Sequence, residues 1–292
     1  MMGTENFLVD TEKQNFLKGA IMEKVAELIR TRRSVRTFDG REVSKEDLDK
    51  LLALMEKTEN PYGIPVEYKL LNAKEQGLTC PVVSGTNLYV GAKIKRTPHA
   101  EEAFGFSVEK FVLYAWSLGI GTVWVGGTMG RDAFERAMTL GEDEMMPCMS
   151  PLGYPAKKMS IKESMMRKGV KADSRAPFET LFFDGSFDVP LTEEKAGRLA
   201  EALEMVRWAP SAVNKQPWRV VVDKNAVHFY LKRSKGFISD ATGDLQKIDL
   251  GIAMYHFELT AKESGLDIEF SIDNPGIATE DNTEYIASYL LS

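Results

Sequence analysis

The chain has 292 residues, of which 43% are hydrophobic and 27% charged, and its net charge is −6. This composition is ample for a packed core in one large domain or two ordinary ones, and it argues against intrinsic disorder. Basic residues are dispersed apart from one arginine cluster, so neither nucleic acid nor a membrane surface is expected as a partner. No apolar run in the sequence is long enough to span a bilayer.

The few cysteines and histidines restrict the chemistry further. Cys80 and Cys148 fit no disulfide framework and no metal spacing, which predicts a reducing, cytoplasmic location. The three histidines are isolated from one another and from the cysteines, so neither a metal site nor a Ser-His-Asp or Cys-His arrangement is expected. Residues 1–20 are polar and weakly patterned. They are interpreted as a flexible leader, native or vector-derived, before a single domain over 21–292.

The first patterned segment is an amphipathic helix that contains Val25–Ile29 and runs into the arginine cluster. The cluster surrounds Ser34 and consists of Arg30, Arg32, Arg33 and Arg36. Arginine presents a planar fork of donors that stays charged, so it can hold a phosphate through two bonds. The alternative is a solvated basic face at the C-terminus of a helix.

A helix–loop–strand pattern then occurs twice in the chain. The first copy has a helix at 47–57, a loop at 60–65 and a strand at 66–71. The second has a helix at 196–207, a loop from 208 and a strand at 220–222. This repetition, read together with the helices described next, predicts an α+β fold made of two degenerate repeats, at about 21–180 and 181–292. Chance identities in an ordinary α+β protein are the alternative.

A long apolar helix follows each copy, at 104–120 and at 248–266. Each is apolar nearly all round, as a helix buried in a core should be, and each ends in a glycine that closes the helix. A strand-like run follows each one, at 122–125 and at 268–272. Aligned on these glycines, Gly119 and Gly265, the helices share Phe111/Phe257, Leu113/Leu259 and Ala115/Ala261.

The loop from Trp208 to Arg219 contains two prolines and three short polar side chains. Pro210 and Pro217 prevent the helix from continuing, because each lacks the amide hydrogen that a helix needs. The polar side chains can hold a flat heterocycle that has alternating donors and acceptors along one edge. An ordinary capped turn before a buried strand is the alternative. The three side chains are Ser211, Asn214 and Gln216.

Taken together, the arginine cluster and this loop resemble the nitroreductase family of FMN-dependent NAD(P)H oxidoreductases. The stretch P-S-A-V-N-K-Q-P-W-R at 210–219 is similar to the family's flavin-edge loop, and R-R-S-V-R at 32–36 to its R-x-S-x-[RK] clamp. Here the first repeat keeps the clamp and the second keeps the loop. The chain therefore resembles two nitroreductase subunits fused into an internal pseudo-dimer, with a mixed sheet flanked by helices and one FMN per chain.

The resemblance implies roles for several residues. Arg32 and Ser34 would hold the FMN phosphate, Arg33 would belong to the same cofactor-binding segment, and Arg36 would support the reduced ring electrostatically. Pro210 belongs to the ring-edge loop with its polar neighbours. Arg175, within R-A-P-F-E, would complete the phosphate grip, although Asp173 stands where the family has a basic residue. Gly126 and Gly127 would let backbone amides approach the ring, with a plain turn as the alternative.

The implied activity is reduction of nitroaromatic, quinone or similar electron-poor acceptors. NAD(P)H would give its hydride to flavin N5, and the acceptor would then occupy the same place in a ping-pong cycle, without a catalytic side chain. One chain suffices for the site, and higher oligomers are compatible with it. Two alternatives remain: an FMN-binding protein of this fold with a sensory or flavin-modifying role, and a non-catalytic remnant.

Overall fold

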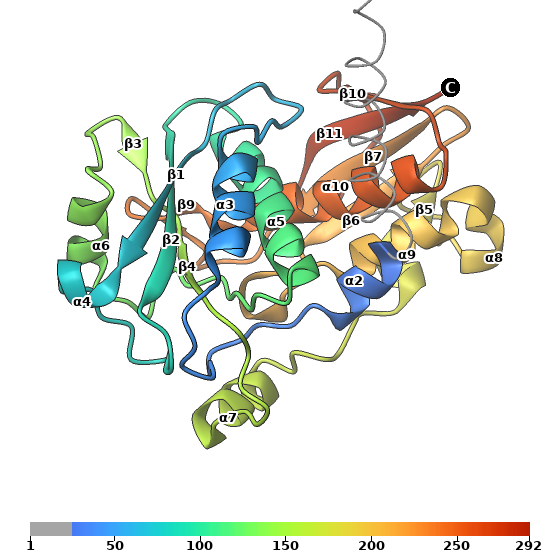
Figure 1. The fold of residues 1–292 in the computed structure, drawn as a ribbon. Helices are drawn as coiled ribbons and strands as arrows, with labels where there is room; N and C mark the ends of the chain where they lie inside the picture. Colours follow the sequence, from blue (N-terminus) through green and yellow to red (C-terminus); the bar gives the residue numbers. More distant parts are fainter. Residues whose placement is uncertain (1–24) are drawn as a thin grey trace, which may run out of the picture.

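The computed structural model describes residues 25–292, so the leader predicted for residues 1–20 lies outside the described residues. Figure 1 shows two β-sheets on opposite sides of a central pair of long helices, α5 and α10. One hydrophobic cluster contains side chains from both sides, among them Phe104 of α5, Trp218 and Phe257 of α10. The two sheets are thus packed around a common core.

The first half of the described chain carries an antiparallel four-stranded sheet. Its strand order is β1-β2-β3, and β4 also pairs with β2. The elements of this half are α2 (Val25–Thr31), α3 (Lys45–Met55), β1 (Glu67–Asn72), α4 (Ala73–Gln76), β2 (Leu88–Lys95), α5 (Ala100–Ser117), α6 (Arg131–Ala137), β3 (Glu144–Met145), β4 (Met149–Leu152) and α7 (Ile161–Gly169).

The second half carries a five-stranded sheet of order β10-β11-β7-β6-β5, in which the β5–β6 pair is parallel and the others antiparallel. Short 3₁₀ helices are written η. The elements are η1 (Phe178–Thr180), β5 (Phe182–Asp184), α8 (Glu193–Ala196), η2 (Gly197–Leu199), α9 (Ala200–Trp208), η3 (Ala212–Asn214), β6 (Trp218–Val222), β7 (Ala226–Lys232), β8 (Ile238–Ser239), β9 (Gly243–Asp244), α10 (Leu245–Glu263), β10 (Ile268–Ser271) and β11 (Thr283–Leu291).

The two sheets repeat one another in order and direction. In the second half β6, β7, β11 and β10 lie side by side. In the first half β1, β2 and β4 lie side by side in the same way. The isolated bridges Gly121–Gly153 and Val125–Met149 place the segment after α5 beside β4, at the position that β10 has in the second sheet. The strand predicted at 122–125 is therefore reduced to isolated bridges. The strands predicted at 66–71, 220–222 and 268–272 are confirmed as β1, β6 and β10.

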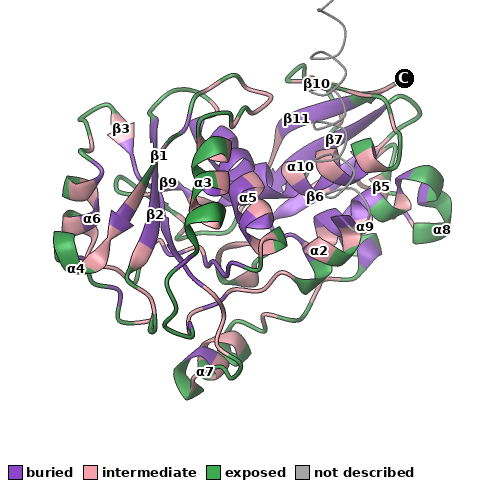
Figure 2. Ribbon diagram, viewed as in Figure 1, coloured by how far each residue is buried: buried purple, intermediate pink, exposed green. Residues whose placement is uncertain are grey.

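The long helices cross where each has a glycine, and both helices are largely buried (Figure 2). A Cβ atom on Gly105 would lie 2.1 Å from the backbone oxygen of Ile248, and one on Gly251 would lie 2.0 Å from that of Glu102. In the alignment on Gly119 and Gly265, Gly105 corresponds to Gly251 and Glu102 to Ile248. The contact is thus reciprocal, as it is across a two-fold interface.

Candidate functional site

A cavity of about 550 Å³ lies where residues of the two halves meet, a volume typical of small-molecule sites. Its walls are the arginine segment, residues 124–128, the end of α7, the loop after α9 and the first turns of α10. Of the residues predicted from sequence, Gln216 does not line it. The others do: Arg32, Arg33, Ser34, Arg36, Gly126, Gly127, Arg175, Pro210, Ser211 and Asn214.

The arginine segment is fixed to the first half by backbone and carboxylate contacts. Val35 N–H donates to the oxygen of Thr122 at 2.8 Å, which holds the segment beside residues 121–125. Glu163, buried at the start of α7, accepts from Arg33 Nη1 at 3.0 Å and from Arg36 N–H at 3.2 Å. Arg32 Nε lies 4.0 Å from the fully buried carboxylate of Glu109. These contacts fix the arginine segment in place along the cavity wall.

The positive charges of this wall are incompletely compensated. Burial lowers the pKa of the Arg32 guanidinium, and the pKa of Arg36 is lowered for the same reason; the neighbouring charge of Arg167 lowers both further. Burial, with the charge of Arg32, lowers the pKa of Arg175 to about 10. The Nε atoms of Arg32, Arg36 and Arg175 are buried without a hydrogen-bond partner among residues 25–292. An anion bound here would satisfy these donors and restore the charge balance.

Arg167 is a member of this cluster that the sequence analysis missed. It lies on α7, lines the cavity and pairs with Asp173, the residue that departs from the family pattern. The sequence gives no indication of its role, because Arg167 is far from the arginine segment in sequence and only the packing of α7 brings the two together. The carboxylate of Asp173 therefore neutralises part of the positive charge at the cavity, whereas a basic residue at this position would add to it.

The loop between α9 and β6 has a strained backbone. Val213, Asn214 and Gln216 have φ values of 44°, 58° and 50°, in the left-handed region. Asparagine tolerates this region, whereas a β-branched valine there costs about 1–3 kcal/mol. Val213 is nevertheless 58% exposed, and it lines the cavity. Backbone strain of this kind clusters at functional sites, where the surrounding structure maintains it.

The polar side chains of the loop hold its shape and attach it to the segment that carries Arg175. Ser211 Oγ accepts from Gln216 N–H at 2.8 Å, and Gln216 Oε1 accepts from Ala176 N–H at 2.9 Å. Asn214 Nδ2 donates to the oxygens of Lys171 and Ser174, at 2.8 and 3.1 Å. Gln216 thus lies behind the loop, whereas Ser211 and Asn214 stand at the cavity.

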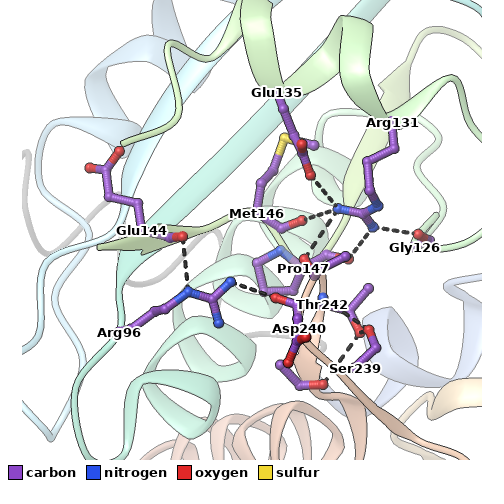
Figure 3. Close-up of polar contacts among 12 residues, drawn as sticks. Arg96, Gly126, Arg131, Glu135, Glu144, Met146, Pro147, Ser239, Asp240 and Thr242 are labelled. Atoms are coloured by element: carbon purple, nitrogen blue, oxygen red, sulfur yellow. Dashed lines mark hydrogen bonds and ion pairs between the residues drawn. The ribbon is translucent and has the colours of Figure 1, made fainter. Parts of the chain in front are cut away.

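The segment with Gly126 and Gly127 is held from outside the cavity by Arg131 of α6 (Figure 3). Arg131 donates to the oxygens of Gly126 and Met146 at 2.6 and 2.9 Å. It also donates to the oxygen of Ala241, in the turn between β8 and β9, at 3.3 Å. A Cβ on Gly127 would meet nothing within 4 Å, so the space beside it is open. One side chain of the first half therefore fixes the cavity wall and a turn of the second half.

Two further acidic side chains were not found from sequence: Asp249, which lines the cavity, and Glu109, which is fully buried behind Arg32. Glu109 of α5 accepts from Trp124 Nε1 at 3.0 Å and contacts His256 Nε2 at 3.0 Å, so it links Arg32 and Trp124 to α10. Asp249 of α10 lines the cavity and accepts from the Ala212 backbone. Neither residue belongs to a local motif, so a single sequence offers no signal for them.

Other kinds of site find no support in residues 25–292. No group of three or more His, Cys, Asp and Glu side chains there is arranged to hold a metal ion. Cys80 and Cys148 are free and buried, and burial raises the pKa of the Cys148 thiol at the cavity wall. Among the same residues, no helix has the length and apolar content that a membrane span requires.

Comparison with known proteins points to one family. The model of the family described as "Putative TM nitroreductase" matches residues 24–261. A protein of Methanothermobacter thermautotrophicus, named "Putative NADH dehydrogenase/NAD(P)H nitroreductase", is 31% identical over 159 residues, which are 48% of this chain and 81% of that protein. The crystal structure described as a putative nitroreductase from Thermotoga maritima superposes with a TM-score of 0.56 at 21% identity, over 91% of this chain and 92% of that one.

Proposed function

The chain belongs to this nitroreductase family and is an oxidoreductase, and on that premise we propose that it is an FMN-dependent NAD(P)H oxidoreductase. Its acceptors are nitroaromatic compounds, quinones or similar electron-poor molecules. The observation that carries the proposal is the meeting of the arginine segment with the 210–214 loop on one cavity. These two motifs lie far apart in sequence and have no other evident reason to converge.

The residues at the cavity fit FMN. Buried guanidinium donors without partners suit a phosphate, and Leu245, Ile248 and Ile252, which also line the cavity, offer an apolar surface for a flat ring. Bound FMN would accept hydride from NAD(P)H and pass electrons to the acceptor. In this proposal Arg32 and Arg175 bind the phosphate end, and Arg36 balances negative charge on the reduced ring. The loop and the backbone at Gly126–Gly127 border the ring.

The same proposal treats residues 21–292 as one domain made of two repeats, 21–180 and 181–292, with one FMN per chain. Three observations support it: the shared sheet order, the reciprocal glycine contact, and a relative that aligns over 81% of its own length with only 48% of this chain. Fusion would place the clamp and the loop of one site in a single chain. The buried free cysteines agree with a cytoplasmic location.

Purified protein supplied with FMN tests the proposal directly. We expect stoichiometric binding of one FMN per chain, followed by bleaching of the flavin absorbance by NADH or NADPH without oxygen, and recovery of the colour on adding a quinone. Protein that binds FMN but is bleached by neither nucleotide would favour a flavin-binding protein without this turnover. Protein that binds no FMN would overturn the proposal.

A further inference from the structure

Asp249 occupies an unusual place for a carboxyl group, in the second turn of α10 at the cavity wall. The residue is 3% exposed, and its neighbours on that wall are the apolar side chains of Leu245, Ile248 and Ile252. The Ala212 backbone N–H donates to Oδ1 at 2.9 Å and lies 3.1 Å from Oδ2. No lysine, arginine or histidine in residues 25–292 pairs with it. Glu109, Glu163 and Asp173 near the same cavity each have such a partner.

Burial without a cationic partner favours the protonated form of this carboxyl group. Burial raises the pKa of Asp249 well above its usual value, and the negative charge of Asp244 acts in the same direction. The Ala212 backbone N–H is a donor to this carboxyl group, and the O–H of the protonated acid is itself a donor that can serve an acceptor in the cavity. The cavity that Asp249 lines is therefore the place where this proton can be given up.

The charged groups around Asp249 have partners of their own. Asp244, the N-cap residue of α10, pairs with Arg233, and Glu102, on the packed helix α5, has Lys247 and His99 within 4 Å. Loop residues 210–214 contribute no titratable side chain. The remaining titratable groups that line the cavity are Arg30, Arg32, Arg33, Arg36, Cys148, Arg167, Asp173 and Arg175.

We propose that Asp249 donates a proton to the acceptor as it is reduced. This inference rests on the proposed function. A quinone takes up two electrons and two protons to become a hydroquinone, and the hydride of NAD(P)H accounts for both electrons and one hydrogen. The second proton passes from the Asp249 O–H to a quinone oxygen: that O–H bond breaks, a new O–H bond forms, and the carboxylate regains a proton from water. The nucleotide leaves as NAD(P)⁺.

The variant Asp249→Asn separates this role from support of the loop, because asparagine keeps an oxygen that can accept from Ala212 but has no acidic proton. We expect quinone reduction by the FMN-loaded variant to slow about a hundredfold, within the usual range for a general acid. Reduction of ferricyanide, which takes one electron and no proton, should stay within about twofold. FMN affinity should be unchanged. The exposed Asp132→Asn is the matched control and should behave as wild type with both acceptors.

A second readout needs neither FMN nor turnover. Because the folded protein holds a proton that the unfolded chain releases near pH 4, wild-type stability should fall as pH rises from that value toward the raised pKa. The melting temperature of apo Asp249→Asn relative to wild type should therefore increase over this range. A difference that is independent of pH would show that Asp249 is ionised when folded, and would overturn the proposal.

The kinetic outcomes distinguish the two levels of inference. Wild-type quinone reduction by Asp249→Asn would overturn the proton-donor role and leave the proposed function intact. Equal slowing with quinone and ferricyanide, together with weaker FMN binding, would show that Asp249 only supports the loop. Wild-type flavoprotein that NAD(P)H does not bleach would overturn the proposed function itself, and this inference with it.

Discussion

On one side of the α5–α10 crossing lies the cavity, and on the other side the corresponding positions are filled with aromatic side chains. In the alignment on Gly119 and Gly265, cavity residues Leu245 and Ile252 correspond to His99 and Phe106, and Trp124 corresponds to Phe270. The equivalent of the 210–214 loop is the segment with Tyr62. This side chain stacks on His99 at 5.2 Å between ring centroids and meets Phe270 edge-on at 4.8 Å.

The aromatic region also lacks a clamp. Asn60 ties its loop to α5 by donating to Ser107 Oγ at 3.0 Å, and the Tyr62 hydroxyl contacts the sulfur of Met254. The sequence before α9 contains no counterpart of R-x-S-x-R. One side of the crossing therefore has charge and space, whereas the other side is filled by packed side chains. If the two halves are repeats, as proposed, the cavity side would serve ligand binding and the aromatic side would stabilise the helix crossing.

The largest expected effect is on the charged side. Replacing both Arg32 and Arg36 by alanine should weaken FMN binding about a hundredfold to a thousandfold, because two charge-assisted contacts to the cofactor are lost. Fluorescence titration of FMN measures the affinity. The exposed Arg198→Ala, which removes a positive charge away from the cavity, should bind as wild type. Undiminished FMN affinity in the double variant would show that the arginines are not the clamp.

On the aromatic side, Tyr62→Ala should lower stability by about 3 kcal/mol, because it removes a ring packed between two others and leaves a cavity. Denaturant unfolding measures the loss. FMN stoichiometry should remain one per chain, since the enlarged space has no cationic clamp. Binding of a second FMN would show that packing alone separates the two regions.

The reciprocal contact at the crossing gives a third test. Gly105→Ala and Gly251→Ala should each destabilise the protein by about 1–3 kcal/mol, since the added Cβ would meet a backbone oxygen of the other helix. Because both substitutions disturb one crossing, their effects on unfolding free energy should not add. Gly169→Ala, where a Cβ meets nothing within 4 Å, is the control. Fully additive losses would mean that the two contacts are independent.

The smallest effect is expected in the loop. Asn214→Gly keeps the left-handed backbone but removes the side-chain hydrogen bonds to Lys171 and Ser174. Because these two bonds are exposed, their loss should lower FMN affinity only about tenfold. Asn282→Gly is the control, because Asn282 also has a left-handed backbone, with φ 62°, and lies exposed in another loop. Equal effects of the two substitutions on FMN titration would show that the Asn214 side chain does not organise the cavity.

Much of the fold follows from local patterns in the sequence. The apolar helices at 104–120 and 248–266 were displaced by only a few residues, to Ala100–Ser117 and Leu245–Glu263, because their periodicity and terminal glycines are local features. The arginine segment and the proline-bounded loop could be recognised for the same reason. The strand expected at 122–125 was reduced to bridges, since its pairing depends on where β4 lies.

The sequence by itself determined the repeated elements, the positive charge of residues 30–36 and the end of α9 before Pro210. Only the tertiary structure decided which polar groups face the cavity. Gln216 turns toward the backbone of Ala176, whereas Arg167 and Asp249 arrive from helices distant in sequence. The reason is physical: periodicity and backbone constraints act over a few neighbouring residues. The burial of a charge and the partner it finds depend instead on contacts between segments that meet only in the folded chain.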